Sequence, residues 1–260
     1  MKLAASNIAW SNEHDNEMYH FLSDNGFSGL EIAPTRIFPE APYDKLEEIN
    51  AFSKQLKANY NLTLCSMQSI WYGMTGNLFA SPEQRHELIQ YTKKAILFAR
   101  AAGIGNLVFG CPKGRNIPDG CTNAHETALA FFDEIGHFAA HNKTVVALEA
   151  NPPCYHTNFL NRTTEAINFA KELRNPGIKI NIDLGTCMYY EEPIALIRDN
   201  LDLVNHIHIS EIMLVPIEKR DLHRKIALLD YDGYCSIEMG SQGDTKAIQS
   251  AISYIREVFH

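Results

Sequence analysis

The sequence lacks long apolar runs and an excess of positive charge, and each absence excludes a class of partner. Its apolar runs are short and interrupted, well below the roughly 20 residues that a membrane-spanning helix needs. Lysine and arginine total 23 against 31 aspartate and glutamate residues, for a formal net charge of −8. Binding to a nucleic-acid backbone depends on clustered cations. We therefore expect neither a membrane nor a nucleic acid as partner.

Closely spaced cysteines are also missing. The chain has six cysteines, none in a Cys-x-x-Cys pair, so the sequence indicates neither a zinc knuckle nor a disulfide framework. Residues 1–10 resemble the start of a strand and contain no long apolar segment with a cleavage site. These features predict a cytoplasmic protein with reduced thiols.

Glycine-rich phosphate loops are absent too. Residues 6–11 follow the first expected strand without the G-x-G-x-x-G pattern of a doubly wound sheet, and no Walker motif occurs. Short apolar runs instead alternate with helical patterns along the whole chain. The expected strands are 3–8, 29–32, 62–68, 106–110, 144–149, 179–183, 204–210 and 234–239. The expected helices are 14–25, 45–58, 83–102, 124–140, 163–174, 192–199, 217–230 and 244–258. Eight strand–helix pairs predict an α/β fold, a single-domain (β/α)8 TIM barrel over residues 1–260.

Polar side chains stand at the carboxyl ends of the expected strands, where barrel enzymes carry their reacting groups. In chain order they are Asn7, Glu31, Gln68, Lys113 with Arg115, Glu149, Asp183, His208 and Glu238. The last four come from four successive strands. Three converging carboxylates repel one another unless a cation compensates them. Three oxygen donors and one imidazole suit one divalent metal, with Mn²⁺ favoured and Mg²⁺, Co²⁺ or Zn²⁺ as alternatives.

Two histidines share one face of the seventh strand, because His206 and His208 are two residues apart. His208 lies nearer the carboxyl end and is the expected ligand, with His206 deeper in the barrel. The alternative for either one alone is a hydrogen-bonded core histidine.

These strand ends carry a family resemblance. The segments 148–152 (LEANP), 182–185 (IDLG), 206–211 (HIHISE) and 236–238 (SIE) resemble the xylose isomerase-like barrel superfamily over essentially the whole chain. That group includes ketose 3-epimerases, hydroxypyruvate isomerase, inosose dehydratase and endonuclease IV. The resemblance implies that Glu149, Asp183, His208 and Glu238 bind the metal. It also implies that Glu149 and Glu238 are catalytic and exchange a proton beside a carbonyl.

The implied function is a metal-dependent isomerase or epimerase of a small sugar, sugar acid or sugar phosphate, acting through an enediolate that the metal stabilises. Two alternatives stay open: a metal-dependent dehydratase of a cyclic polyol or keto acid, and a barrel that binds sugar without turning it over. Self-association is open as well.

The sequence departs from the family at two places. Thr186 stands where many members have a histidine after the sixth-strand aspartate, and Tyr189, Tyr190 or Glu191 are candidate substitutes. The segment 220–223 (RDLH) replaces a region often rich in glycine. Without further histidines at the second and third strand ends, the three-zinc cluster of endonuclease IV lacks ligands, which disfavours DNA repair.

Other polar residues are candidate substrate contacts. Lys113 and Arg115 lie in a Gly/Pro-rich loop and are expected to hold an anionic group; the alternative is a solvated turn. The remaining candidates are Gln68, His156, Glu211 and His223. His156 has a mobile surface loop as its alternative, and His223 a place on a helix surface. The expected substrate is a small carbohydrate, either neutral or carrying an anionic group.

Overall fold

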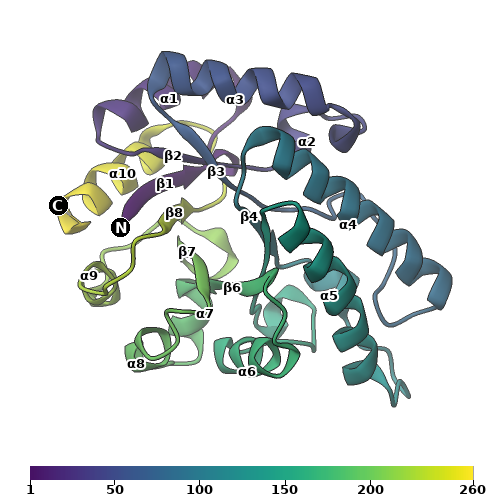
Figure 1. Ribbon diagram of the computed structural model, residues 1–260. Coiled ribbons are helices and arrows are strands. Elements are labelled where there is room, and N and C mark those ends of the chain that lie inside the picture. Colours follow the sequence, from purple (N-terminus) through teal and green to yellow (C-terminus); the bar gives the residue numbers. More distant parts are fainter. Residues whose placement is uncertain (260) are drawn as a thin grey trace.

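Eight parallel strands form a closed barrel in the computed structural model, which describes residues 1–259 (Figure 1). Each strand pairs with the next, and β8 closes on β1. The strands are β1 (Lys2–Ser6), β2 (Gly29–Ile32), β3 (Thr63–Met67), β4 (Asn106–Phe109), β5 (Val145–Glu149), β6 (Ile178–Asp183), β7 (Val204–Ser210) and β8 (Tyr234–Glu238). The predicted single-domain (β/α)8 barrel is confirmed.

Helices surround the barrel on its outside (Figure 1). They are α1 (Asp15–Asp24), α3 (Leu46–Tyr60), α4 (Pro82–Ala102), α5 (Ala124–His141), α6 (Thr163–Leu173), α8 (Ile194–Arg198), α9 (Asp221–Ala227) and α10 (Lys246–Phe259). Two short helices, α2 (Pro34–Ile37) and α7 (Leu184–Tyr189), follow β2 and β6 directly. Within residues 1–259, no helix combines the length and the apolar character required to cross a bilayer.

Local signals explain where several helices begin and end. The Ser81 side chain accepts a hydrogen bond from the Gln84 amide, and Pro82 opens α4. Gly103, with φ of 75°, ends the same helix in the left-handed conformation. The helix predicted over 217–230 is shorter than expected and spans only α9. The sequence pattern also missed α7, which begins because the Asp183 side chain accepts a hydrogen bond from the Thr186 amide.

Alternating side chains divide each strand between the outer core and the barrel interior. On β7, Ile207 and Ile209 belong to the hydrophobic core that the helices cover. His206 and His208 are also buried, and they contact residues of β2, β5 and β8 across the interior. The barrel interior thus presents polar groups at the carboxyl ends of the strands.

Candidate metal centre

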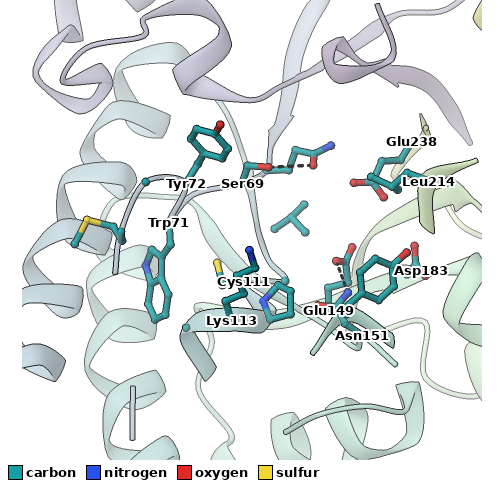
Figure 2. Close-up of a pocket in the computed structure, with 18 of the residues that line it drawn as sticks. Ser69, Trp71, Tyr72, Cys111, Lys113, Glu149, Asn151, Asp183, Leu214 and Glu238 are labelled. Atoms are coloured by element: carbon teal, nitrogen blue, oxygen red, sulfur yellow. Dashed lines mark hydrogen bonds between the residues drawn. The ribbon is translucent and has the colours of Figure 1, made fainter. Parts of the chain in front are cut away.

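Four potential ligands meet at the carboxyl ends of β5, β6, β7 and β8. They are Glu149, Asp183, His208 and Glu238, whose ligand atoms all lie within 4.8 Å of one another. His208 Nδ1 lies 2.9 Å from Glu149 Oε1 and 3.0 Å from Glu238 Oε2. The three carboxylates reach into the same side of one cavity (Figure 2). The strand ends therefore assemble the donor set that the sequence predicts.

The His208 ring is oriented by a carboxylate on the far side of the barrel. Its Nε2 lies 3.0 Å from Glu31 Oε2 and donates a hydrogen bond to it. When Nδ1 loses its proton, its lone pair faces Glu149 and Glu238, whose oxygens lie 2.9 Å and 3.0 Å away. A metal-binding histidine typically donates its other ring N–H to a carboxylate in this way. An imidazole nitrogen among three carboxylates fits a divalent cation.

Glu31 is completely buried and is shared by several donors. Gln68 Nε2 donates to its Oε1 at 3.1 Å, and His206 Nε2 lies 3.3 Å from its Oε2. Burial alone raises the pKa of Glu31, but the two histidines outweigh it and hold that pKa well below its ordinary value. Glu31, His206 and His208 also form a second potential ligand group. Because His208 Nε2 is hydrogen-bonded to Glu31, we interpret Glu31 and His206 as partners that orient His208 toward the cluster of Glu149, Asp183 and Glu238.

Replacing Glu31 by glutamine is expected to weaken Mn²⁺ binding by roughly 10- to 100-fold, the usual cost of losing an outer partner of a metal ligand. Titration of the purified protein with Mn²⁺, followed by electron paramagnetic resonance, measures this affinity. Asp15→Asn is the matched control, because Asp15 pairs with Arg36 away from the cluster. Equal affinities for the Glu31 variant and the wild type would contradict the role of Glu31.

The three carboxylates of the cluster differ in their support. Glu149 accepts hydrogen bonds from Asn181 Nδ2 at 2.7 Å and Asn151 Nδ2 at 3.0 Å. Asp183 accepts from the Thr186 amide at 2.6 Å and from the Ser210 hydroxyl.

These surroundings separate the pKa values of the carboxylates. Burial raises the pKa of Glu149, but the hydrogen bond and charge of His208 outweigh it and lower the pKa below its ordinary value. Burial raises the pKa of Glu238 to about 7 against the opposing effect of His208. Burial and the charge of Glu149 raise the pKa of Asp183. Without a cation, the cluster therefore retains protons that a free carboxylate would lose.

Metal affinity is expected to rise with pH, because the cation competes with these protons. Burial lowers the pKa of His208, but Glu238 and Glu31 outweigh it and raise the pKa well above the ordinary value. Below a pH of about 7, binding must displace protons from Glu238 and His208; above it, the Glu238 carboxylate is free. Calorimetric titration with Mn²⁺ in buffers of different ionisation enthalpy measures the released protons. An affinity that does not change with pH would contradict this expectation.

The cluster borders a cavity of about 460 Å³. Trp71 and Tyr72 lie opposite the carboxylates, and Lys113 lies between the two groups (Figure 2). Tyr72 is 70% exposed, so its ring is available to an incoming molecule. The cavity thus combines an aromatic side, a carboxylate cluster and one lysine.

The predicted substrate contacts fall into two groups. Gln68 and Lys113 line the cavity, although the Gln68 amide also donates to Ser6 Oγ at 2.7 Å. Four others do not line it: Arg115, His156, Glu211 and His223.

Each of these four has another environment. Arg115 is completely buried and bonded to Asn151, and His156 is exposed beyond β5. Glu211 is buried and pairs with Arg220 at 2.8 Å. His223 Nδ1 lies 3.1 Å from the Tyr254 hydroxyl, and burial lowers the pKa of His223 to about 4.

Thr186 does not leave a gap where the family often has histidine. It is buried, and its hydroxyl donates to the Ala150 carbonyl at 2.9 Å. The candidate substitutes for that histidine, Tyr189, Tyr190 and Glu191, do not line the cavity. Tyr155, from the loop after β5, lines it instead.

Several supporting residues escaped the sequence analysis. Asn181 carried a usable signal, because it lies two residues before Asp183 and so faces the same side of β6. Asn151 follows Glu149 just as closely. Gly110 carried no signal, yet a Cβ there would lie 2.8 Å from Glu149 Oε2.

Fold and site together define a (β/α)8 barrel with a candidate metal centre on four successive strand ends. The sequence profile of the xylose isomerase-like TIM barrel family matches residues 19–258, and the chain belongs to this family. No curated protein sequence gives a significant match.

Solved structures of similar fold share low sequence identity with the chain. A 3-keto-D-glucoside 4-epimerase from E. coli superposes with a TM-score of 0.79 at 20% identity, covering 99% of both chains. A D-psicose 3-epimerase from Clostridium cellulolyticum H10, solved with D-tagatose, gives 0.77 at 17% identity over 100% of both chains. A family 2 AP endonuclease from Brucella melitensis gives 0.76 at 18% identity over 98% of both. At these identities the likeness establishes the shared fold.

Proposed function

We propose that the protein is a divalent-metal-dependent isomerase or epimerase of a small sugar, sugar acid or sugar phosphate. The observation that carries this proposal is the meeting of three carboxylates and one imidazole nitrogen at the edge of an open cavity. Glu149, Asp183, His208 and Glu238 would hold the cation. Manganese is the metal we favour, because oxygen donors with one imidazole suit it.

Glu149 and Glu238 are the proposed proton carriers, since both line the cavity and lie within 3.0 Å of the same ligand nitrogen. A bound divalent cation would supply polarisation of the substrate carbonyl. Each glutamate offers a carboxylate to the cavity, so one can remove the neighbouring C–H proton while the other delivers a proton to the substrate. Return of a proton to the opposite face gives an epimer, and transfer to the adjacent carbon gives an isomer.

The cavity supports a carbohydrate substrate. Tyr72 offers an exposed aromatic ring to a sugar, and Trp71 and Gln68, both buried, border the same cavity. Lys113 would hold the carboxylate or phosphate of an anionic sugar. Two of the structures of similar fold are those of sugar epimerases. The net charge of −8 supports a small-molecule substrate over nucleic acid. The six free cysteines favour a cytoplasmic location.

The test is incubation of the Mn²⁺-loaded protein with a panel of ketoses, their acids and their phosphates in D₂O, followed by NMR. Deuterium at a carbon beside the carbonyl, together with a new epimer or isomer, supports the proposal, and both should disappear after chelation. Loss of water with a new ultraviolet chromophore would instead indicate a dehydratase. Binding without exchange would indicate a sugar-binding barrel, and cleavage of DNA at an abasic site would indicate an endonuclease.

A further inference from the structure

Arg115 is the one lysine or arginine among residues 1–259 whose side chain is fully buried. It ends the short 3-10 helix Pro112–Arg115 in the loop after β4. Its Nη2 donates to Asn151 Oδ1 at 2.8 Å, while Nε and Nη1 have no hydrogen-bond partner. Burying a cation with unpaired donors is costly. The burial of an arginine with two unpaired donor groups therefore suggests that its remaining hydrogen bond has a function.

The one side-chain hydrogen bond of Arg115 connects it, through Asn151, to Glu149 of the metal cluster. Asn151 accepts from Arg115 through Oδ1 and donates through Nδ2 to Glu149 Oε2 at 3.0 Å. A guanidinium group can only donate and a carboxylate can only accept, so Asn151 is held between Arg115 and Glu149 with its amide in one orientation. Without the guanidinium, Asn151 loses one of the two contacts that hold its amide, and the side chain can move away from the carboxylate. The hydrogen bond that holds Glu149 therefore depends on a residue that does not touch it.

The loop after β4 is built closely around this chain of contacts. A Cβ at Gly110 would lie 2.8 Å from Glu149 Oε2 and 3.3 Å from Asn151 Oδ1. Glycine thus allows the backbone to pack directly against both acceptor atoms, and Arg115 approaches Asn151 from the same loop.

We propose that Arg115 is a positioning residue, which acts through Asn151 to hold the Glu149 carboxylate in its ligand orientation. This inference rests on the proposed metal centre. It replaces the expected role of Arg115 as a grip for an anionic substrate, because the side chain is buried and does not line the cavity. Lys113 remains the cation that the cavity offers to a ligand.

The test compares Mn²⁺ affinities of Arg115→Met, Asn151→Ala and the double variant, measured by electron paramagnetic resonance. We expect each single variant to bind Mn²⁺ roughly tenfold or more weakly, within the range known for outer partners of metal ligands. The double variant should bind no more weakly than Asn151→Ala alone, because both changes break the same chain of contacts. Two independent effects on Mn²⁺ affinity would instead add in the double variant.

Arg100→Met is the matched control. Arg100 Nη1 makes the same kind of bond, 3.0 Å to Asn142 Oδ1, at the end of α4 and outside the site. Its removal should leave Mn²⁺ affinity unchanged. Arg115→Lys, which keeps a cationic donor, should retain more affinity than Arg115→Met.

Circular dichroism first establishes that each variant is folded. Unchanged Mn²⁺ affinity in Arg115→Met, or losses that simply add in the double variant, would overturn the role of Arg115. If Arg115→Met does not fold, wild-type affinity in Asn151→Ala overturns it equally.

A wild type that binds no Mn²⁺ would refute the metal centre itself and leave Arg115 to be judged separately. A crystal structure of metal-free Arg115→Met then decides. A displaced Asn151 side chain together with a displaced Glu149 supports positioning, and an unmoved Glu149 overturns it.

Discussion

Replacing Glu149 and Glu238 together by glutamine is expected to reduce sugar conversion at least a thousandfold, since one general acid or base contributes roughly 10²–10⁴ to a rate. Glutamine keeps the shape of each side chain but cannot accept the C–H proton. Turnover and deuterium exchange in D₂O, both followed by NMR, measure the effect. Glu134→Gln is the control, because Glu134 pairs with Lys93 on the surface.

The single variants refine this expectation. With Glu238→Gln, deuterium exchange in one epimer should survive while conversion to the other stops, because Glu149 can still remove and return a proton on its own side. Metal content must be measured in every variant, since both glutamates are also proposed ligands. Metal-dependent turnover retained by the double variant would refute the assignment of the proton carriers.

Replacing Gly110 by alanine is expected to weaken Mn²⁺ binding beyond the roughly 10- to 100-fold typical of outer partners. The new Cβ would lie 2.8 Å from Glu149 Oε2, so a ligand itself must move. Overpacking of this kind should also lower the free energy of unfolding by about 1–3 kcal/mol. Mn²⁺ titration and urea denaturation measure the two effects.

Gly105→Ala provides a closely matched comparison. Gly105 precedes the same strand, and a Cβ there would meet no atom within 4 Å. Metal affinity should therefore match that of the wild type. Equal affinities for the two alanine variants would show that Glu149 adapts to the added methyl group.

The barrel and the four clustered side chains were predictable from sequence for one physical reason. Carboxyl ends of successive parallel strands meet at one edge, so residues as distant as Glu149 and Glu238 are neighbours once the barrel closes. The short helix α7 was not predictable in the same way. It depends on capping by Asp183, and a single capping bond is invisible in a periodic pattern.

The groups that support the cluster depend on contacts that no local pattern reveals. Glu31 and His208 are 177 positions apart and meet across the barrel interior. Arg115 lies in a Gly/Pro-rich loop that has the composition of a solvated turn. The burial of Arg115 and the packing of Gly110 against Glu149 show that this loop turns inward. The inward or outward direction of such a loop is decided by tertiary contacts.

The hydrogen bond between His208 of β7 and Glu31 of β2 connects the C-terminal part of the barrel, which carries the proposed ligands, to its N-terminal part. All four proposed ligands belong to the last four strands, so a fragment beginning after α4 would contain every donor atom. It would still lack Glu31, and with it the carboxylate that directs His208 Nδ1 toward the other three. This fragment would thus keep the ligands but lose the group that orients His208, and full metal affinity would return only when residues 1–102 were added back.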